Sequence, residues 1–122
     1  MQLQGIYVPI VTPFDADGAV DEGRLAELAA ALIDRGVAGL AACGTTGEYY
    51  ALDDAERGRV LDVVARAGRG KVTLIAGVGD LSTRRSGERG GEAAALGYDA
   101  LLLSPPPYSL PTAAGIRAHF EY

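Results

Sequence analysis

The segment Gly44-Thr45-Thr46-Gly47-Glu48 combines two glycines, two hydroxyls and one carboxylate within five residues. Glycine lets the backbone turn tightly with several N–H groups facing one point, and the two threonine hydroxyls add donors beside them. Such a group of donors suits a carboxylate or another small anion without requiring a cation. The same residues also fit a tight turn in which a threonine or Glu48 caps the following helix. The residue types alone leave both interpretations open.

A second candidate segment, residues 104–108, has the sequence SPPPY. Its prolines stiffen the backbone and hold the phenol of Tyr108 in a fixed position, which suggests a role in proton transfer. Because a phenol has a pKa of about 10, Tyr108 would have to act through hydrogen-bonded partners rather than as a lone base. The alternative is a tyrosine that packs on a proline-rich loop.

Other residues with reactive side chains do not form a complete set. His119 has no second histidine, cysteine or paired carboxylate at ligand spacing, so it is expected on a helix surface. Cys43 has no histidine near it in sequence and is expected to be a small buried side chain. The pattern Gly77-x-Gly79-x-x-Ser82 lacks the third glycine of a dinucleotide-binding fingerprint. We therefore expect no metal and no cofactor.

Composition and net charge limit the kinds of molecule that the protein is expected to bind. With 122 residues, 48% hydrophobic and 22% charged, the chain has the character of one globular domain, residues 1–122. The formal net charge of -5 argues against nucleic acid and against an anionic membrane surface. No apolar run approaches the roughly 20 residues that span a bilayer. A single cysteine excludes an internal disulfide, and the absence of a leader-like N-terminus favours a cytoplasmic location.

Four short apolar runs, near residues 6–11, 37–43, 72–76 and 100–103, are predicted strands. Each is too short for a helix and apolar on both faces, as in a parallel sheet that is covered on both sides. Amphipathic segments separate the runs, although the segment 82–96 contains three glycines that weaken a helix. The repeat of roughly 30 residues indicates an α/β fold of four βα units.

The connecting helices have recognisable ends. Asp21 can cap the first helix and Gly36 can end it. The pair Asp53-x-x-Glu56 has the form of a capping box and predicts the start of the second helix. Thr112 can cap the last helix. The element order is therefore strand and helix in strict alternation.

Two architectures fit this order: an open flavodoxin-like sheet, or the first half of a (β/α)8 barrel. The repeats alone do not decide between them. In a barrel the active site is built from the loops that follow the strands. Residues 44–48 follow the second predicted strand and residues 104–108 follow the fourth. The loops therefore favour the barrel.

Four loop segments together resemble the Schiff-base lyases and synthases that include dihydrodipicolinate synthase and N-acetylneuraminate lyase. In chain order these segments are Val11-Thr12-Pro13-Phe14, Gly44-Thr45-Thr46-Gly47-Glu48, Ala76-Gly77-Val78-Gly79 with Thr83, and Pro106-Pro107-Tyr108 with Pro111. Each follows one of the four predicted strands, and the likeness spans nearly the whole chain. The resemblance implies a TIM (β/α)8 barrel, of which this chain supplies about the first four βα units.

The resemblance also implies a chemistry: a lysine forms an imine with pyruvate or a 2-keto-3-deoxy sugar acid in an aldolase- or dehydratase-type lyase. Thr45 would belong to a hydroxyl proton relay, and Tyr108 would be a relay tyrosine lent to a neighbouring subunit. Thr46 and the backbone from Gly44 through Thr45 to Gly47 would hold the keto-acid carboxylate. The complete protein would be a homo-oligomer, a dimer of dimers.

The chain departs from the family pattern in two respects. In the family, the imine lysine lies on strand six and a second relay tyrosine on strand five, whereas the only lysine here, Lys71, precedes the third predicted strand. That position is at the structural end of a barrel, so this chain alone is expected to be inactive. Two bulky rings, Tyr49 and Tyr50, follow Glu48, and Pro107 replaces a family tyrosine. Glu48, Tyr49 and Tyr50 are therefore candidates for substrate selectivity, and they resemble the sugar-acid branch.

A second hypothesis is a non-enzymatic, four-stranded α/β module that binds a small anion at residues 44–47. It is motivated by the length of the chain and by the absence of a usable lysine. The edges of the sheet discriminate the two hypotheses, because half a barrel leaves its first and fourth strands unpaired on their outer sides.

Overall fold

The computed structural model describes residues 3–106, 108 and 110–122, so Pro107 lies outside the described residues. Four strands lie at the four predicted apolar runs and pair in parallel, in the order β1-β2-β3-β4. They are β1 (Tyr7–Pro9), β2 (Gly39–Ala42), β3 (Thr73–Gly77) and β4 (Ala100–Leu102). Each strand therefore pairs with the strand that precedes or follows it in the chain.

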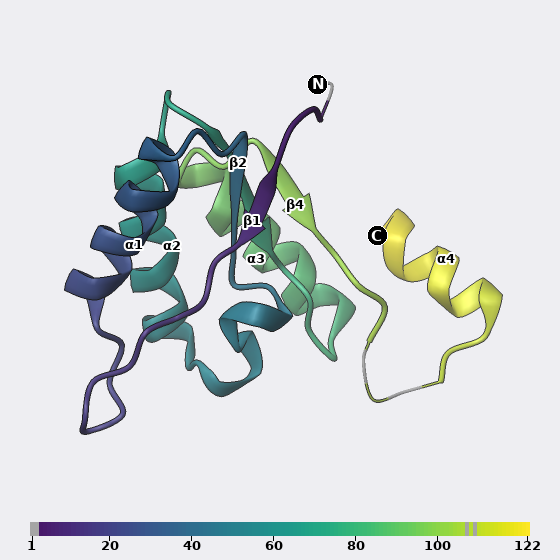
Figure 1. The fold of residues 1–122 in the computed structure, drawn as a ribbon. Helices are drawn as coiled ribbons and strands as arrows, with labels where there is room; N and C mark the ends of the chain where they lie inside the picture. The colour runs from purple at the N-terminus through teal and green to yellow at the C-terminus, as the bar shows by residue number, and fades with distance from the viewer. Residues whose placement is uncertain (1–2, 107, 109) are drawn as a thin grey trace.

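A helix follows each strand, as Figure 1 shows. The four helices are α1 (Glu22–Asp34), α2 (Asp54–Gly68), α3 (Thr83–Ala95) and α4 (Ala113–Glu121). Two short 3-10 turns, η1 (Thr45–Gly47) and η2 (Tyr49–Ala51), lie between β2 and α2. Helices α1 and α2 pack side by side, whereas α4 lies apart from them, beyond β4 (Figure 1).

The helices that follow β2 and β3 cover the same face of the sheet. A Cβ atom on Gly68 of α2 would lie 2.8 Å from Leu74, and one on Gly90 of α3 would lie 3.2 Å from Leu101. Leu101 is in register with Ala76, and Ala76 and Leu74 point to the same face because they are two residues apart on β3. A flavodoxin-like sheet reverses its strand order and carries helices on both faces. Sequential strands with helices on one face are instead the arrangement of a TIM barrel.

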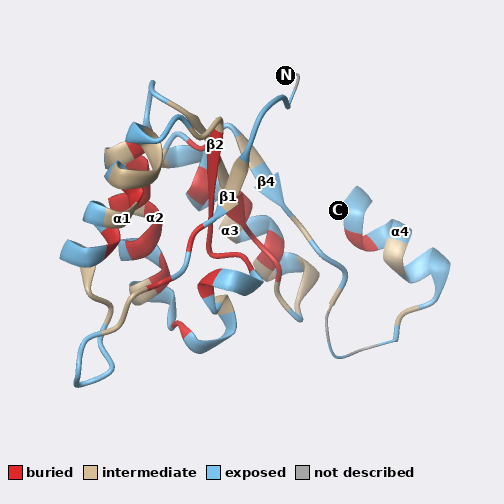
Figure 2. Ribbon diagram, in the orientation of Figure 1, coloured by how far each residue is buried: buried red, intermediate tan, exposed pale blue. Residues whose placement is uncertain are grey.

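The core lies between the sheet and helices α1 to α3. Most of its largest fully buried side chains come from β2, β3 and the facing sides of the helices, where buried residues appear red in Figure 2. They include Leu25, Leu40, Leu61, Leu74 and Val64. The third helix forms despite its glycines, and for two of them the structure gives a reason. A Cβ atom on Gly87 would lie 3.3 Å from the Tyr122 ring, and Gly90 admits Leu101 at similarly close range.

The two outer strands are less covered than the central pair (Figure 2). Leu101 and Leu102 of β4 are 50% and 51% exposed, and Ile6 beside β1 is 70% exposed. Within the described residues, β1 and β4 each pair on one side only. Both edges are thus open, as expected of half a barrel. Among the helices in the described part of the chain, none is long and apolar enough to cross a membrane.

Helix α2 begins with a capping box formed by Asp53 and Glu56. Asp53 accepts a hydrogen bond from the Glu56 N–H at 2.7 Å, and the Glu56 carboxylate accepts one from the Asp53 N–H at 2.9 Å. We expect Asp53→Ala to lower the free energy of unfolding by about 1 kcal/mol, because one helix N–H loses its partner. Urea unfolding measures the difference. Asp53→Asn keeps the acceptor and should stay close to wild type, and equal losses in both variants would contradict the capping role.

Candidate active site

The segment of residues 44–48 forms a tight turn at the C-terminal end of β2. Its backbone closes through hydrogen bonds from the Gly47 N–H to the Gly44 carbonyl and from the Glu48 N–H to the Thr45 carbonyl. Cys43 and Glu48, on either side, have φ angles of 54° and 53°. The alternative of a threonine or Glu48 as helix cap is wrong, because Asp53 caps α2 and neither 3-10 turn has a side-chain cap. We call residues 44–47 the cradle.

The loop that follows β1 contacts the cradle and holds it in place. The buried hydroxyl of Thr12 donates to the Gly47 carbonyl at 2.7 Å, and a Cβ atom on Gly47 would lie 3.0 Å from the Ile10 carbonyl oxygen. Gly47 must therefore be small for the two loops to approach this closely. The sequence places Thr12 in one of the four loop segments but does not reveal this hydrogen bond, which joins residues 35 positions apart.

The end of β3 supports the cradle from the other side. A Cβ atom on Gly77 would overlap the Cys43 carbonyl oxygen and would lie 2.6 Å from the Cys43 carbonyl carbon and 3.0 Å from the Gly44 nitrogen. Only glycine permits this contact between the end of one strand and the peptide that enters the cradle. The chain thus brings three of the four predicted loops against one another.

A cavity of about 210 Å³ opens at the C-terminal ends of β2, β3 and β4. Its polar and backbone lining comes from all three strand ends, namely Gly44, Thr45, Tyr49, Gly77, Gly79 and Ser104. The volume is below that of typical drug-sized sites, so it suits a ligand of few heavy atoms. Thr46 and Gly47 are not among the described residues that line it, although Thr46 is exposed beside it.

Tyr108 lies away from Thr45 in the single chain. Its side chain is 91% exposed and lines a separate cavity of about 370 Å³ together with Tyr49, Tyr50 and Arg89. Tyr49 contributes to both cavities, and its ring meets the Tyr50 ring edge to face at a centroid distance of 5.6 Å. The structure therefore brings Thr45 and Tyr49 together at the smaller cavity, and Tyr50 and Tyr108 at the second one. The third selectivity candidate, Glu48, is exposed and is not among the described residues that line either cavity.

Cys43 is buried behind the cradle. Burial raises the pKa of its thiol to about 11, although the positive charges of Arg57 and Arg89 act in the opposite direction. The thiol is neutral at physiological pH, so it is a poor nucleophile. Lys71 is exposed at the N-terminal end of β3, whereas the cavity lies beyond the C-terminal end of the same strand.

The expectation that His119 lies on a helix surface is wrong. Its side chain is 6% exposed, and its two ring nitrogens lie 2.9 Å from the Thr83 hydroxyl and 3.2 Å from the Ser104 carbonyl oxygen. His119 thus joins α4 to the start of α3 and to the loop after β4. Among the described residues, no three or more His, Cys, Asp or Glu side chains are grouped so that they could hold a metal ion.

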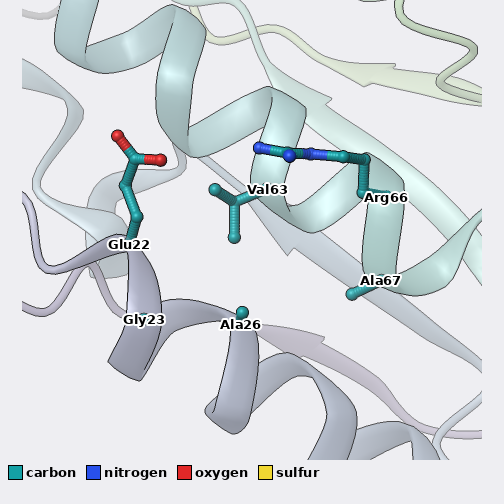
Figure 3. A pocket seen from close by; sticks show the side chains of 6 residues that line it. All are labelled: Glu22, Gly23, Ala26, Val63, Arg66 and Ala67. Carbon is teal, nitrogen blue, oxygen red and sulfur yellow. The ribbon is translucent and has the colours of Figure 1, made fainter.

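A larger cavity, of about 480 Å³, lies between α1 and α2. Figure 3 shows Glu22 and Ala26 of α1 facing Val63 and Arg66 of α2 across it. This cavity is on the helical outer layer and contains none of the strand-end loops. In a barrel fold, catalysis belongs at the C-terminal ends of the strands, so the smaller cavity is the candidate site.

The comparison with known proteins agrees with this geometry. The model of the Dihydrodipicolinate synthetase family matches residues 2–122. The chain belongs to this family. A 4-hydroxy-tetrahydrodipicolinate synthase from Sorangium cellulosum (strain So ce56) is 42% identical over 120 residues, which are 98% of this chain and 40% of that protein.

Solved structures of family members superpose closely on this chain. A dihydrodipicolinate synthase crystal structure gives a TM-score of 0.93 at 39% identity, over 98% of this chain and 41% of that one. A prophage protein from E. coli K12, of the dihydrodipicolinic acid synthase family and solved in complex with pyruvate, gives 0.91 at 31% identity, over 96% of this chain and 39% of that one. The chain therefore spans about two fifths of the length of the relatives it matches.

Proposed function

We propose that this chain is the N-terminal, keto-acid-binding part of a lyase or synthase that acts through a lysine imine. The observation that carries the proposal is the cradle at the end of β2, which opens into a small cavity that the ends of β3 and β4 complete. The pyruvate complex of the related E. coli K12 prophage protein supports a 2-keto acid as the ligand class. The lysine would come from a later strand, since Lys71 is at the wrong end of β3.

Each cradle residue has a role in this proposal. The backbone N–H groups of Gly44 to Thr46 and the Thr46 hydroxyl hold the substrate carboxylate, as donors converging on an anion do, while the Gly47 N–H closes the turn on the Gly44 carbonyl. The Thr45 hydroxyl, which lines the cavity, passes a proton to or from the reacting carbon. Tyr108 joins the same relay in a neighbouring subunit, for which its 91% exposure is suited. We accordingly propose a homo-oligomer, a dimer of dimers, in the cytoplasm.

The neighbourhood of the cradle favours a sugar-acid substrate. Tyr49 lies between the two cavities, and Tyr50 is 68% exposed beside it. These phenols can donate hydrogen bonds to the hydroxyls of a polyol chain. We propose that the carboxylate end of a 2-keto-3-deoxy sugar acid occupies the smaller cavity and that its hydroxyl chain extends toward the tyrosines.

Borohydride trapping tests the proposed function. The full-length protein is incubated with pyruvate or with a 2-keto-3-deoxy sugar acid, reduced with borohydride, and examined by mass spectrometry. We expect one reduced adduct per subunit, on a lysine outside residues 1–122, and no adduct on the 122-residue chain tested alone. If no 2-keto acid gives a mass increase, the protein does not act through an imine. An adduct on Lys71 would contradict the assignment of the imine to a lysine on a later strand.

A further inference from the structure

Arg57 is a charged side chain with an unusual position. It lies on α2, is 2% exposed, and donates from Nη2 to the Gly77 carbonyl at 2.6 Å. Burial of a guanidinium is unfavourable unless its hydrogen bonds and charge are compensated. Nη1 of Arg57 is buried with no hydrogen-bond partner, and no carboxylate forms an ion pair with Arg57 within the described ranges. No carboxylate in the described residues therefore pairs directly with this charge, although Glu92 acts on it at longer range.

The partner of Arg57 connects it to the cradle. Gly77 packs against the peptide between Cys43 and Gly44, so a hydrogen bond that fixes the Gly77 carbonyl also fixes the floor of the cradle. The charge reaches the same place, because Arg57 lowers the pKa of the Cys43 thiol against the larger effect of burial. The cradle itself is lined by donors but by no cation in the described part of the site.

A second arginine shows by contrast what is special about Arg57. Arg89 of α3 donates to the Gly79 carbonyl at 3.0 Å, two residues further along the same loop. Its charge is matched by the carboxylates of Asp80 at 3.0 Å and Asp54 at 3.4 Å. Arg89 therefore holds the loop as part of a neutralised network, whereas Arg57 leaves a positive charge behind the cradle.

We infer that Arg57 is a positioning residue for carboxylate binding: it fixes the Gly77 carbonyl and supplies the positive charge that makes the cradle select an anion. This inference rests on the proposed function, because it assumes that a keto-acid carboxylate occupies the cradle. The bound carboxylate is then the missing counter-charge for the buried guanidinium. Arg57 is not among the described residues that line the cavity, so its effect is on binding more than on turnover.

The test compares a charged and a neutral ligand in the full-length protein. Borohydride trapping is measured against the concentration of pyruvate and of pyruvamide, which differs in having a neutral amide. We expect Arg57→Gln to raise the half-saturating concentration of pyruvate about tenfold, as loss of one charged interaction does. The half-saturating concentration of pyruvamide should change less than about twofold, because the neutral amide makes no charge interaction with Arg57 that the substitution could remove. Arg57→Lys keeps the charge and should keep most of the preference for pyruvate.

Controls separate this role from a general effect on folding. Arg59→Gln alters an arginine of the same helix that is 46% exposed and pairs with Glu22, and it should leave both half-saturating concentrations unchanged. An unchanged preference in Arg57→Gln would overturn the inference, as would equal weakening of both ligands. If Arg57→Gln does not fold, loss of the preference in Arg57→Lys would overturn it and retention would support it. Failure of wild type to trap any 2-keto acid would instead remove the proposed function.

Discussion

Replacing Gly77 with alanine is expected to lower the free energy of unfolding by about 3 kcal/mol, a large effect for one methyl group. The new Cβ would overlap the Cys43 carbonyl oxygen, and the atoms it meets are backbone atoms that cannot rotate away. Either β3 or the entry to the cradle must shift. The same shift should abolish keto-acid trapping in the full-length protein, even where the variant still folds.

Urea unfolding measures the loss, and Gly58→Ala provides the matched control. Gly58 lies inside α2, and a Cβ atom there would meet nothing within 4 Å. Alanine is the better helix former, so this control should gain up to about 1 kcal/mol. A Gly77→Ala protein as stable as wild type would show that β3 does not approach the cradle as closely as described.

Replacing Thr45 with valine is expected to lower turnover of the full-length protein about 100-fold, the usual size of one positioned proton-transfer group. Valine has nearly the shape of threonine but lacks the hydroxyl of Thr45, which is one of the residues that line the cavity. In the proposed mechanism the imine should still form, because the proposed lysine lies on a later strand and not in this loop. Turnover and trapping are therefore measured on the same preparation.

Two further variants identify the reason for that loss. Thr45→Ser restores a hydroxyl and should recover most of the turnover. Thr46→Val should act differently, raising the half-saturating keto-acid concentration more than it lowers turnover, because Thr46 is assigned to the carboxylate. Wild-type turnover in Thr45→Val would take Thr45 out of the relay.

The elements of this fold could be predicted because their signals are local. The capping box of Asp53 and Glu56, the Asp21 and Thr112 caps, and the short apolar runs each involve residues a few positions apart. The order of the strands could not be derived from the repeats, since the same four βα units fit a flavodoxin-like sheet. That choice depends on which face each helix covers, and the structure settles it through contacts such as that between Gly90 and Leu101.

The tight turn of residues 44–47 at the end of β2 could also be predicted, but the residues that hold this turn in place could not. Thr12 and Arg57 reach carbonyl groups 35 and 20 positions away, and such long-range hydrogen bonds leave no trace in spacing. One signal was available for Arg57: it precedes Val60 and Val64 by three and seven residues, so it shares their buried helix face. His119 lies three residues after Ile116 in the same way, which is the spacing of one face of a helix.

The nearest-neighbour pairing of β1 to β4 has a consequence for how the chain acquires its structure. Among the described strands, each ladder joins consecutive βα units, with paired residues 25 to 34 positions apart. The entropic cost of closing such a connection grows only slowly with its length, so each unit can close on its neighbour at a similar cost. A nascent chain leaving the ribosome can therefore add one unit at a time to the sheet already formed, with β4 as the growing edge. The exposed Leu101 and Leu102 then mark the side of the sheet that stays open within the described residues.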